Sequence, residues 1–529
     1  MKRRGFLGWV GGLAGGAARP NFFEALLAEG EEQRTSAGII GMYIHQHWPY
    51  HHPYSARTWT LGDYQGYADG LTKLGYNTMM IWPLLETMPS PLTPSDRANL
   101  EKIAQVIDVL HHDFKMRVWV ALCPNVAAND QEAAKRPFAK RHFFSCDTRV
   151  NPADPAAMRK MMAWREKLLR PLAKVDGVTL IDSDPGGYPG STNDQFVNLL
   201  AEHRKMLDQL RPGIEMYYWM HAGWDAYGRF YQTGEFHWGT AEEARDVLTR
   251  LEKLNPEPWG ITVNTLNDVF PPPDRTHLAV ASKLGLASRA IGFSYGAIEG
   301  EPTFPMTNFG GDSAFKAGGT KAPRGVMGNA QTHCVQLPNT FAFARGATGK
   351  PVTEADYVAF ADDLIGGQGH TIVQAWQTLA RGAPPTKREM AENLEVLSQR
   401  ELPTGDLKGL LLGDPRRFLT DLMMQLRLKA AFDDFVAATE SDRDVKPSLS
   451  SFVTAAEVWQ KQHGYECAWS WPKLAEALRK LKSPVIDAVL DEKGEGKTPF
   501  DRVEDSLRRM ETYTPRLIAA MKKTLENMS

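Results

Sequence analysis

The sequence contains little cysteine. Four residues occur in a chain of 529, at Cys123, Cys146, Cys334 and Cys467. They are widely separated, and none has the short spacing to a second cysteine or to a histidine that marks a metal site. The spacing therefore argues against a cysteine-based metal centre, and a disulfide between Cys123 and Cys146 stays open.

An excess of charge of one sign is also missing. The formal net charge is -2, with 43% hydrophobic and 23% charged residues, which is ordinary globular composition. There is no long basic stripe of the kind that binds nucleic acid. No apolar run after the N-terminal segment is long enough to span a bilayer. We therefore expect neither a nucleic-acid partner nor a stable membrane span, while the oligomeric state stays open.

The N-terminal segment reads as a targeting signal rather than as part of the fold. The stretch MKRRGFLGWVGGLAGGAARP has a basic start, a short glycine- and alanine-rich apolar region and small residues near Ala17 and Ala18. The pair Arg3-Arg4 before Gly-Phe-Leu resembles the twin-arginine type. We assign residues 1–37 to an export signal and linker, which predicts a periplasmic or secreted protein. The alternative is a basic N-terminus that arose by chance.

From residue 38 the chain alternates short strand-like runs with longer amphipathic helical patterns. This alternation indicates βα units around a parallel sheet. Eight βα units over residues 38–348 predict a TIM (β/α)8 barrel. A doubly wound open sheet is the alternative, but no glycine-rich dinucleotide motif follows the first strand. No cofactor is therefore predicted. The eight expected strands lie in GIIGMYIHQ, YNTMMIWP, MRVWVALCP, GVTLIDSD, GIEMYYWMH, PWGITVN, RAIGFSYG and RGVMGNA.

After about residue 350 the strand pattern stops. Stretches such as VTEADYVAFADDLI and RRFLTDLMMQLRLKAAFDDFVAAT have helical periodicity. We predict an all-helical domain over residues 349–529, packed on the barrel.

Polar and aromatic side chains gather where the predicted strands end. In a barrel enzyme the active site lies at the carboxyl ends of the strands, whatever the reaction. Tryptophan rings there are candidate platforms for sugar rings, although each could equally belong to the core. We predict catalytic groups at His45, Asp182, Asp184 and Glu299, and substrate contacts at His47, Arg57, Trp82, Glu86, Trp219, His221, Trp224, Asn264, Tyr295, Asn329 and Gln331.

The fourth predicted strand ends in two aspartates, in LIDSDPGG. Residues two apart in a strand share a face, so Asp182 and Asp184 would point the same way with Cα atoms about 7 Å apart. Like charges this close raise the pKa of one carboxyl group, as a general acid requires. Gly186 and Gly187 would leave space for a ligand beside the backbone. Alternatively, Asp184 caps the turn and Asp182 pairs with a barrel Arg or His.

This acidic pair resembles a known site. A barrel with Asp-x-Asp at the end of its fourth strand is similar to the N-acetylhexosaminidase and chitinase-type glycosidases. The segment RGVMGNAQTHCVQLPNTFAFARG, running into helices, is similar to the layout of bacterial α-glucuronidases. The resemblance implies that Asp182 polarises the substrate and that Asp184 is the acid. Asp184 stands where many relatives have Glu, and a proline follows it.

The end of the first predicted strand is rich in histidine, in YIHQHWPYHH. His45 and His47 share one face and could bind sugar hydroxyl groups, supply a base, or hold a metal together with an aspartate. They could also be structural. Further signals of a hydrolytic metal barrel are missing, so we predict no metal. An acidic sugar would require an arginine near the pocket. The candidates for that role are Arg57, Arg289, Arg324 and Arg345.

Together these features predict an exo-acting glycoside hydrolase that releases a terminal N-acetylated or acidic sugar, such as a hexosamine, sialic acid or glucuronic acid, from a glycan. Glu299 is the reserve carboxylate if Asp184 is not the acid. Two alternatives stay open. One is a metal-dependent barrel hydrolase or sugar isomerase that uses His45, His47 and an aspartate. The other is a carbohydrate-binding protein without catalysis.

Overall fold

A computed structural model gives the architecture of the chain. The structure describes residues 38–183, 186–221, 223–235, 241–254, 259–263, 277–293, 296, 298–299, 306–309, 311–320, 322–382, 384–441, 443–467, 471 and 473–528. The predicted export segment, and the sequence-predicted site residues Asp184, Asn264 and Tyr295, lie outside these residues.

Eight parallel strands close into a barrel in the order β1-β10-β9-β8-β7-β6-β3-β2. Each lies within one of the eight predicted runs, so the TIM barrel is confirmed, and the doubly wound sheet is wrong. The strands are buried because both faces of a barrel sheet are covered. Their bounds are β1 (Ile39–Ile44), β2 (Thr78–Ile81), β3 (Arg117–Leu122), β6 (Gly177–Ile181), β7 (Glu215–Trp219), β8 (Trp259–Val263), β9 (Ala290–Phe293) and β10 (Gly325–Ala330).

The barrel closes between its first and last strands, with Ile39 paired to Gly325 and Ile44 to Ala330. Gly325 has a φ of 128°, and a Cβ there would lie 2.1 Å from the carbonyl oxygen of Ile39. Only glycine fits so close to the neighbouring backbone.

Helices surround the strands. Three of them begin at a threonine whose hydroxyl group accepts from the N3 amide while the N3 side chain returns a hydrogen bond, at Thr60, Thr93 and Thr192. The helices are α2 (Leu61–Leu74), α3 (Pro94–Phe114), α6 (Pro155–Leu169), α7 (Asn193–Leu210), α8 (Trp224–Thr233), α9 (Ala241–Leu254), α10 (His277–Lys283), α11 (Asp312–Gly319) and α12 (Leu337–Ala347).

An excursion between β3 and β6 was not foreseen from the sequence. It contains the antiparallel pair β4 (Val126–Ala128) and β5 (Asp147–Arg149), with the short helices α4 (Asp130–Ala134) and α5 (Phe143–Cys146) between them. Because it leaves the carboxyl end of β3, it adds a second layer to the rim of the barrel where an active site is expected.

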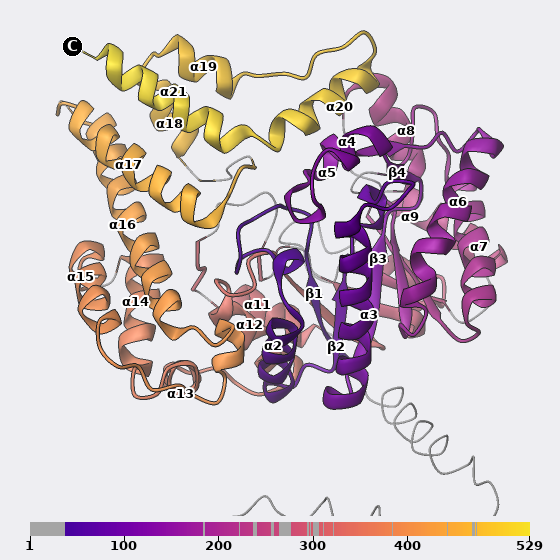
Figure 1. Ribbon diagram of the computed structural model, residues 1–529, viewed down its shortest axis with the longest axis horizontal. Coiled ribbons are helices and arrows are strands. Elements are labelled where there is room, and N and C mark those ends of the chain that lie inside the picture. Colours follow the sequence, from indigo (N-terminus) through magenta and orange to yellow (C-terminus); the bar gives the residue numbers. More distant parts are fainter. Residues whose placement is uncertain are drawn as a thin grey trace, which may run out of the picture. The chain divides into compact units, whose positions relative to one another are not determined.

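The C-terminal part is helical, as predicted, and only the boundary at residues 348–349 stays a prediction. The described residues after β10 contain no strand, only one isolated bridge between Ile365 and Thr404. Figure 1 shows α13–α17 beside the barrel, α20 above α4 and α5, and α21 above α17. The helices are α13 (Glu354–Leu364), α14 (Gly369–Arg381), α15 (Lys387–Ser398), α16 (Pro415–Thr439), α17 (Lys446–His463), α18 (Leu474–Arg479), α19 (Pro484–Leu490), α20 (Pro499–Met510) and α21 (Tyr513–Asn527).

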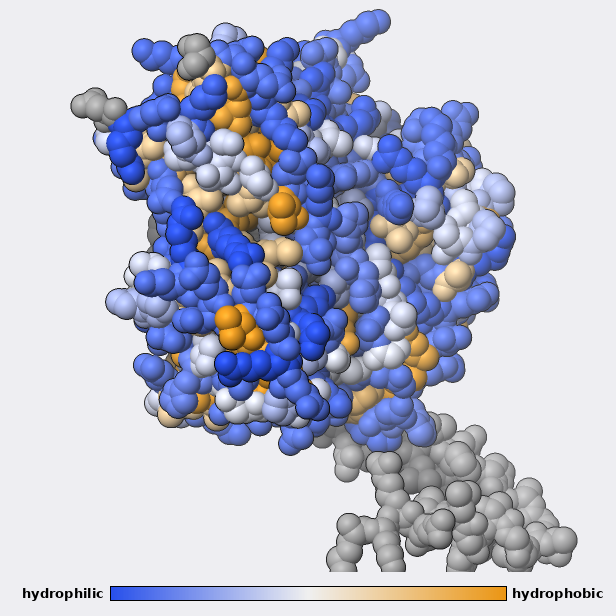
Figure 2. Space-filling model, turned by 60° about the vertical axis from the view of Figure 1, so that its left-hand side comes forward, coloured by the Kyte–Doolittle hydropathy of each residue, from blue (hydrophilic) through white to orange (hydrophobic). Residues whose placement is uncertain are grey.

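Residues 39–529 form one compact unit, and a continuous hydrophobic core joins the barrel to the C-terminal helices. The face seen in Figure 2 is mainly hydrophilic, with small scattered apolar patches. None of the described helices has the length and apolar character needed to cross a membrane. The four cysteines are buried free thiols, so Cys123 and Cys146 are not joined.

Candidate active site

The carboxylate of Asp182 lies at the carboxyl end of one barrel strand and is held by three hydrogen bonds. It directly follows β6 and is completely buried. Its Oδ2 accepts hydrogen bonds from the Tyr218 hydroxyl group at 2.7 Å and from the amides of His221 and Gly223 at 3.1 and 2.7 Å. Burial, followed by the charge of Asp182, raises the pKa of Tyr218 well above its usual value, so the phenol stays a donor. Three donors on one oxygen fix the carboxylate and stabilise its charge.

The chain after Asp182 folds back sharply. A Cβ on Gly186 would lie 2.0 Å from the carbonyl oxygen of Asp182. That carbonyl also accepts from the indole Nε1 of Trp224 at 3.1 Å. The side-chain amide of Asn125 holds Gly187, donating to its carbonyl oxygen at 2.8 Å and accepting from its amide at 3.1 Å. The space that a Cβ of Gly186 would take is therefore filled by the protein itself, and the approach of a ligand to this backbone stays a prediction.

His221 lies beside Asp182 and is partly exposed. Its Nδ1 is 2.8 Å from the hydroxyl group of Tyr227. Burial, together with the nearby His277, lowers the pKa of His221 to about 3, so the ring is neutral at neutral pH. A neutral imidazole can accept or donate a hydrogen bond to a sugar without adding charge.

His45 and His47 lie together after β1, with stacked rings 5.5 Å apart. The Nδ1 of His45 accepts from the amide of His47 at 3.2 Å. Burial lowers the pKa of His47 well below its usual value, so this ring is neutral. Neither ring nitrogen of His47 has a hydrogen-bond partner among the described residues. Within the same residues, no group of three or more histidine, cysteine, aspartate or glutamate side chains could hold a metal ion.

Aromatic rings enclose His47 on several sides. The nearest belongs to Trp48, at 4.2 Å between centroids, and Trp82 lies at 5.3 Å. Phe143 and Phe144, from the excursion after β3, lie at 4.6 and 5.0 Å. We call these four residues the aromatic wall.

The other predicted tryptophans have separate positions. Trp219, the last residue of β7, packs edge-on against Tyr43 and Phe293 at 5.2 and 4.2 Å. Trp224 is completely buried against Phe196, at 5.2 Å. Its contact with the Asp182 carbonyl oxygen makes it a support for the loop.

Glu299 is buried and engaged at both oxygens. Its Oε2 accepts from the amides of Gln331 and Thr332 at 2.8 and 2.7 Å, and its Oε1 accepts from the Thr332 hydroxyl group at 2.6 Å. Burial raises the pKa of Glu299, and these donors oppose the rise. Asn329 donates to the Glu299 carbonyl oxygen at 3.4 Å, and the Oε1 of Gln331 accepts from Trp48 at 2.9 Å. This geometry ties the loop after β10 to Glu299, which follows β9, and to Trp48, which follows β1.

Two further predicted substrate contacts bond to the protein itself. The Arg57 guanidinium donates to the carbonyl oxygens of Gln46, His47, Phe138 and Arg141, holding the loop after β1 against the excursion. Glu86 accepts from the Cys123 amide at 2.5 Å and from Trp82 at 3.3 Å. Burial raises the pKa of Glu86, while Arg165 opposes the rise.

Tyr218, Gly223, Phe143 and Phe144 were not predicted from the sequence as site residues. Tyr218 pairs with Leu180 on β6, so the order of the barrel strands could have placed it beside the end of that strand. The two phenylalanines carry no such signal, because α5 is only four residues long.

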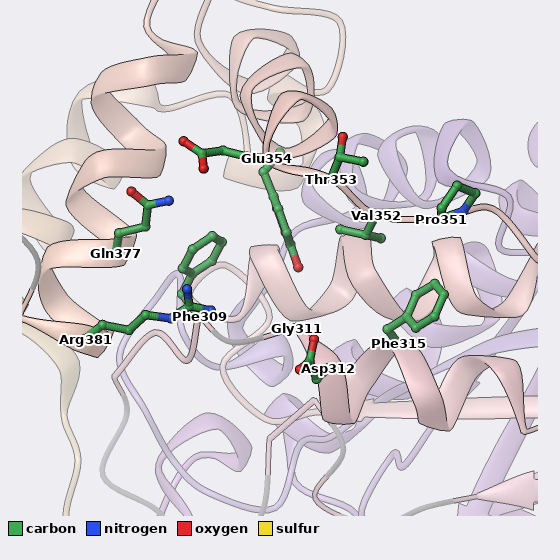
Figure 3. A pocket seen from close by; sticks show the side chains of 11 residues that line it. Phe309, Gly311, Asp312, Phe315, Pro351, Val352, Thr353, Glu354, Gln377 and Arg381 are labelled. Atoms are coloured by element: carbon green, nitrogen blue, oxygen red, sulfur yellow. The ribbon is translucent and has the colours of Figure 1, made fainter.

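A separate cavity of about 400 Å³ opens between α11, α13 and α14 (Figure 3). Gln377 and Arg381 project from α14 and Asp312 from α11, but no predicted site residue lines it. The Phe309 ring is covered by Arg381, at 5.7 Å, and by Trp376, at 5.8 Å. The Phe309 ring therefore offers no open face on which a sugar could stack.

No family model matches the chain, and no curated protein matches it. Among solved structures, a family 89 glycoside hydrolase from Clostridium perfringens has 10% identity and a TM-score of 0.49, over 93% of this chain and 64% of that one. A GH138 enzyme targeting pectin rhamnogalacturonan II has 9% identity and a TM-score of 0.44, over 92% of this chain and 84% of that one. The Thermobaculum terrenum O-GlcNAc hydrolase mutant has 8% identity and a TM-score of 0.38, over 89% of this chain and 92% of that one.

Proposed function

We propose that the protein is an exo-acting glycoside hydrolase that releases a terminal N-acetylated sugar from a glycan, with Asp182 and Asp184 as its catalytic carboxylates. The observation that carries the proposal is the buried Asp182 carboxylate at the end of β6, fixed by Tyr218 and by the amides of His221 and Gly223. Groups fixed in this way serve catalysis because they need no reorganisation when charge develops in the transition state.

The proposed reaction uses the substrate's own acetamido group. Its carbonyl oxygen attacks the anomeric carbon while the bond to the glycosidic oxygen breaks. Asp184 gives its proton to that oxygen, and Asp182 accepts the amide N–H and stabilises the positive charge that develops on the ring formed. Water then attacks the anomeric carbon, the bond from that carbon to the acetamido oxygen breaks, and the water returns a proton to Asp184. The acetamido group is restored, so the sum is hydrolysis of one glycosidic bond.

The choice of an N-acetylated over an acidic sugar rests on the arginines. A sugar carboxylate is usually gripped by a bidentate arginine. Arg57 is engaged by backbone carbonyl oxygens. The three remaining candidates form ion pairs, Arg289 with Glu252, Arg324 with Glu215 and Arg345 with Asp356. Arg289 and Arg324 also precede β9 and β10, at the end of the barrel opposite the catalytic rim. An acidic sugar is therefore the less favoured substrate.

The aryl-glycosides of N-acetylhexosamines, sialic acid and glucuronic acid test the proposal. We expect turnover of an N-acetylhexosaminide, and a fall in kcat of about 10³-fold in both Asp182→Asn and Asp184→Asn. Asp176→Asn is the matched control, because Asp176 immediately precedes β6 and so lies at the opposite end of the same strand. It should retain kcat within about threefold, since no catalytic interaction is lost. Full activity in both site variants would end the assignment.

A further inference from the structure

The turn that carries Phe143 and Phe144 lies at the mouth of the barrel. Besides their contacts with His47, the Phe143 ring lies 5.4 Å from Trp82 and the Phe144 ring 6.2 Å from Trp48. Both phenylalanines are buried, and they follow one another in a single short helix. The position of this one turn therefore decides where half of the aromatic wall stands.

A carboxylate from the C-terminal helices holds this turn. Glu511 lies between α20 and α21 and is completely buried. Its Oε1 accepts from the Phe144 amide at 2.7 Å, and its Oε2 accepts from the Ser145 hydroxyl group at 2.7 Å. The contact joins residues more than 360 positions apart, so it forms only when the C-terminal helices are docked on the barrel.

A second contact supports the same turn. The Nε2 of His142, the residue before α5, lies 2.8 Å from a carboxylate oxygen of Glu466. The carbonyl oxygen of Glu466 accepts from the Thr514 amide at 3.0 Å, which connects it to α21. The C-terminal region thus binds the turn at two places, through Glu466 at its start and through Glu511 within it.

Burying the carboxylate of Glu511 costs desolvation free energy, so this residue is better explained by the geometry that it imposes on its hydrogen-bond partners. A buried carboxylate contributes little net stability even when paired, and such groups can specify one geometry over others. Burial raises the pKa of Glu511, while His142 and the hydrogen bonds from the turn oppose the rise. An apolar contact at this place would bury the same area without fixing the turn.

We infer that Glu511 is a positioning residue: it fixes the Phe143–Phe144 turn against His47, so that the C-terminal helices complete the substrate pocket. The kinetic consequence rests on the proposed function, whereas the structural consequence does not. A sugar bound beside His47 would meet a fixed aromatic surface in the intact protein and a loose one without Glu511. Binding of the sugar should therefore suffer more than the chemical step.

Hydrogen exchange of the full-length protein tests the structural part. In Glu511→Ala we expect the amides of residues 143–145 to exchange about tenfold faster, because the hydrogen bonds from the Phe144 amide and the Ser145 hydroxyl group are both lost. Glu504→Gln is the matched control: Glu504 lies on α20, and its carboxylate pairs with Arg149 of β5 rather than with a group of the turn. Exchange of the turn should be unchanged in that control. If Glu511→Ala does not fold, Ser145→Ala removes one partner from the other side and should give the same local change to a lesser degree.

Kinetics test the functional part on the N-acetylhexosaminide that the wild type cleaves. Glu511→Ala should raise KM by about tenfold and lower kcat by less than about threefold, since the lost interaction concerns binding. Glu511→Gln, which keeps one acceptor oxygen, should lie between the wild type and Glu511→Ala, and Glu504→Gln should match the wild type.

The outcomes separate the two proposals. The role of Glu511 would be overturned if hydrogen exchange of residues 143–145 were unchanged in both Glu511→Ala and Ser145→Ala. It would also be overturned if exchange became faster in Glu511→Ala while KM stayed unchanged. If the wild type cleaved no glycoside, the proposed function would fail and the role in the pocket with it, yet faster exchange of the turn would still show that Glu511 holds it.

Discussion

The hydroxyl group of Tyr218 donates a 2.7 Å hydrogen bond to the Oδ2 of Asp182, across neighbouring strands of the barrel. Both groups are buried, so the hydrogen bond is made where water does not compete. It fixes the carboxylate of Asp182 from the side of the sheet where the Tyr218 ring packs against Phe196 of α7, at 5.0 Å, and so makes Tyr218 part of the candidate site.

Tyr218→Phe should therefore lower kcat while leaving the fold intact. Loss of one hydrogen bond to a charged group corresponds to about 1.5–3 kcal/mol, or roughly a 10- to 100-fold fall in kcat. Steady-state kinetics on the aryl-glycoside would measure it. Tyr217→Phe is the control, because its hydroxyl group lies on the same strand but donates to Glu215. An equal loss of kcat in both variants would contradict a special role for Tyr218.

Asp147 predicts a pH dependence of stability. Burial raises the pKa of this carboxyl group to about 8, although Arg149 opposes the rise. Glu504 and Glu511 also raise it, and Arg508 lowers it. Neither carboxylate oxygen has a hydrogen-bond partner among the described residues. In the unfolded state Asp147 loses its proton near pH 4, whereas in the folded state it keeps the proton up to about pH 8. The free energy of unfolding therefore falls as the pH rises from about 4 to 8.

Asp147→Asn should remove this loss. The free energy of unfolding should rise by on the order of 1–3 kcal/mol at pH 8, and by less at pH 5, because the unfavourable ionisation is removed. Urea denaturation at the two pH values measures it. Asp108→Asn, which breaks an exposed ion pair with Lys174, is the control and should change little at either pH. An equal gain at both pH values would show that Asp147 titrates normally.

The sequence was sufficient for the barrel because each strand is a compact run of apolar residues with turn residues after it. It was not sufficient for the excursion after β3, since β4 and β5 have three residues each and show no period. The helical C-terminal region could be predicted from periodicity, but its contact with the barrel through Glu511 could not.

The candidate site was predictable in its location and less so in its roles. Asp182 stands at the end of β6 as expected. Arg57 has the right charge for a sugar carboxylate, yet it binds carbonyl oxygens of residues more than 80 positions away. No local pattern encodes such contacts. In the same way, Gly186 is explained by a carbonyl oxygen four residues earlier.

His47→Phe should separate stability from function. The imidazole is enclosed by the aromatic wall and carries two buried nitrogens without a partner among the described residues. Replacing it with a phenyl ring removes polar atoms from an apolar place, so the free energy of unfolding should rise by about 1 kcal/mol. If the imidazole binds the sugar, kcat/KM should fall by about tenfold in the same variant.

Denaturation and steady-state kinetics of this variant are read together. His463→Phe serves as the control, since His463 is equally buried and its ring packs against Tyr54 and Trp459 rather than against the aromatic wall. Greater stability with unchanged kcat/KM in His47→Phe would mean that His47 only fills space.

A chelator should leave wild-type activity unchanged, and activity that needs a divalent ion would favour the metal-dependent alternative.

Gly186→Ala should damage the site through the backbone. The added Cβ would lie 2.0 Å from the carbonyl oxygen of Asp182, and a backbone atom cannot move aside as a flexible side chain can. We expect a loss of about 3 kcal/mol in the free energy of unfolding, as for a severely overpacked position, and a displaced Asp182. The fraction that remains folded should therefore have a reduced kcat.

Gly62→Ala is the control. Gly62 lies in α2, and an added Cβ would meet only the Thr60 hydroxyl oxygen, at 3.7 Å, so the free energy of unfolding should rise by up to about 1 kcal/mol from helix propensity. Wild-type kcat in Gly186→Ala would mean that the turn after β6 does not set the position of the carboxylate.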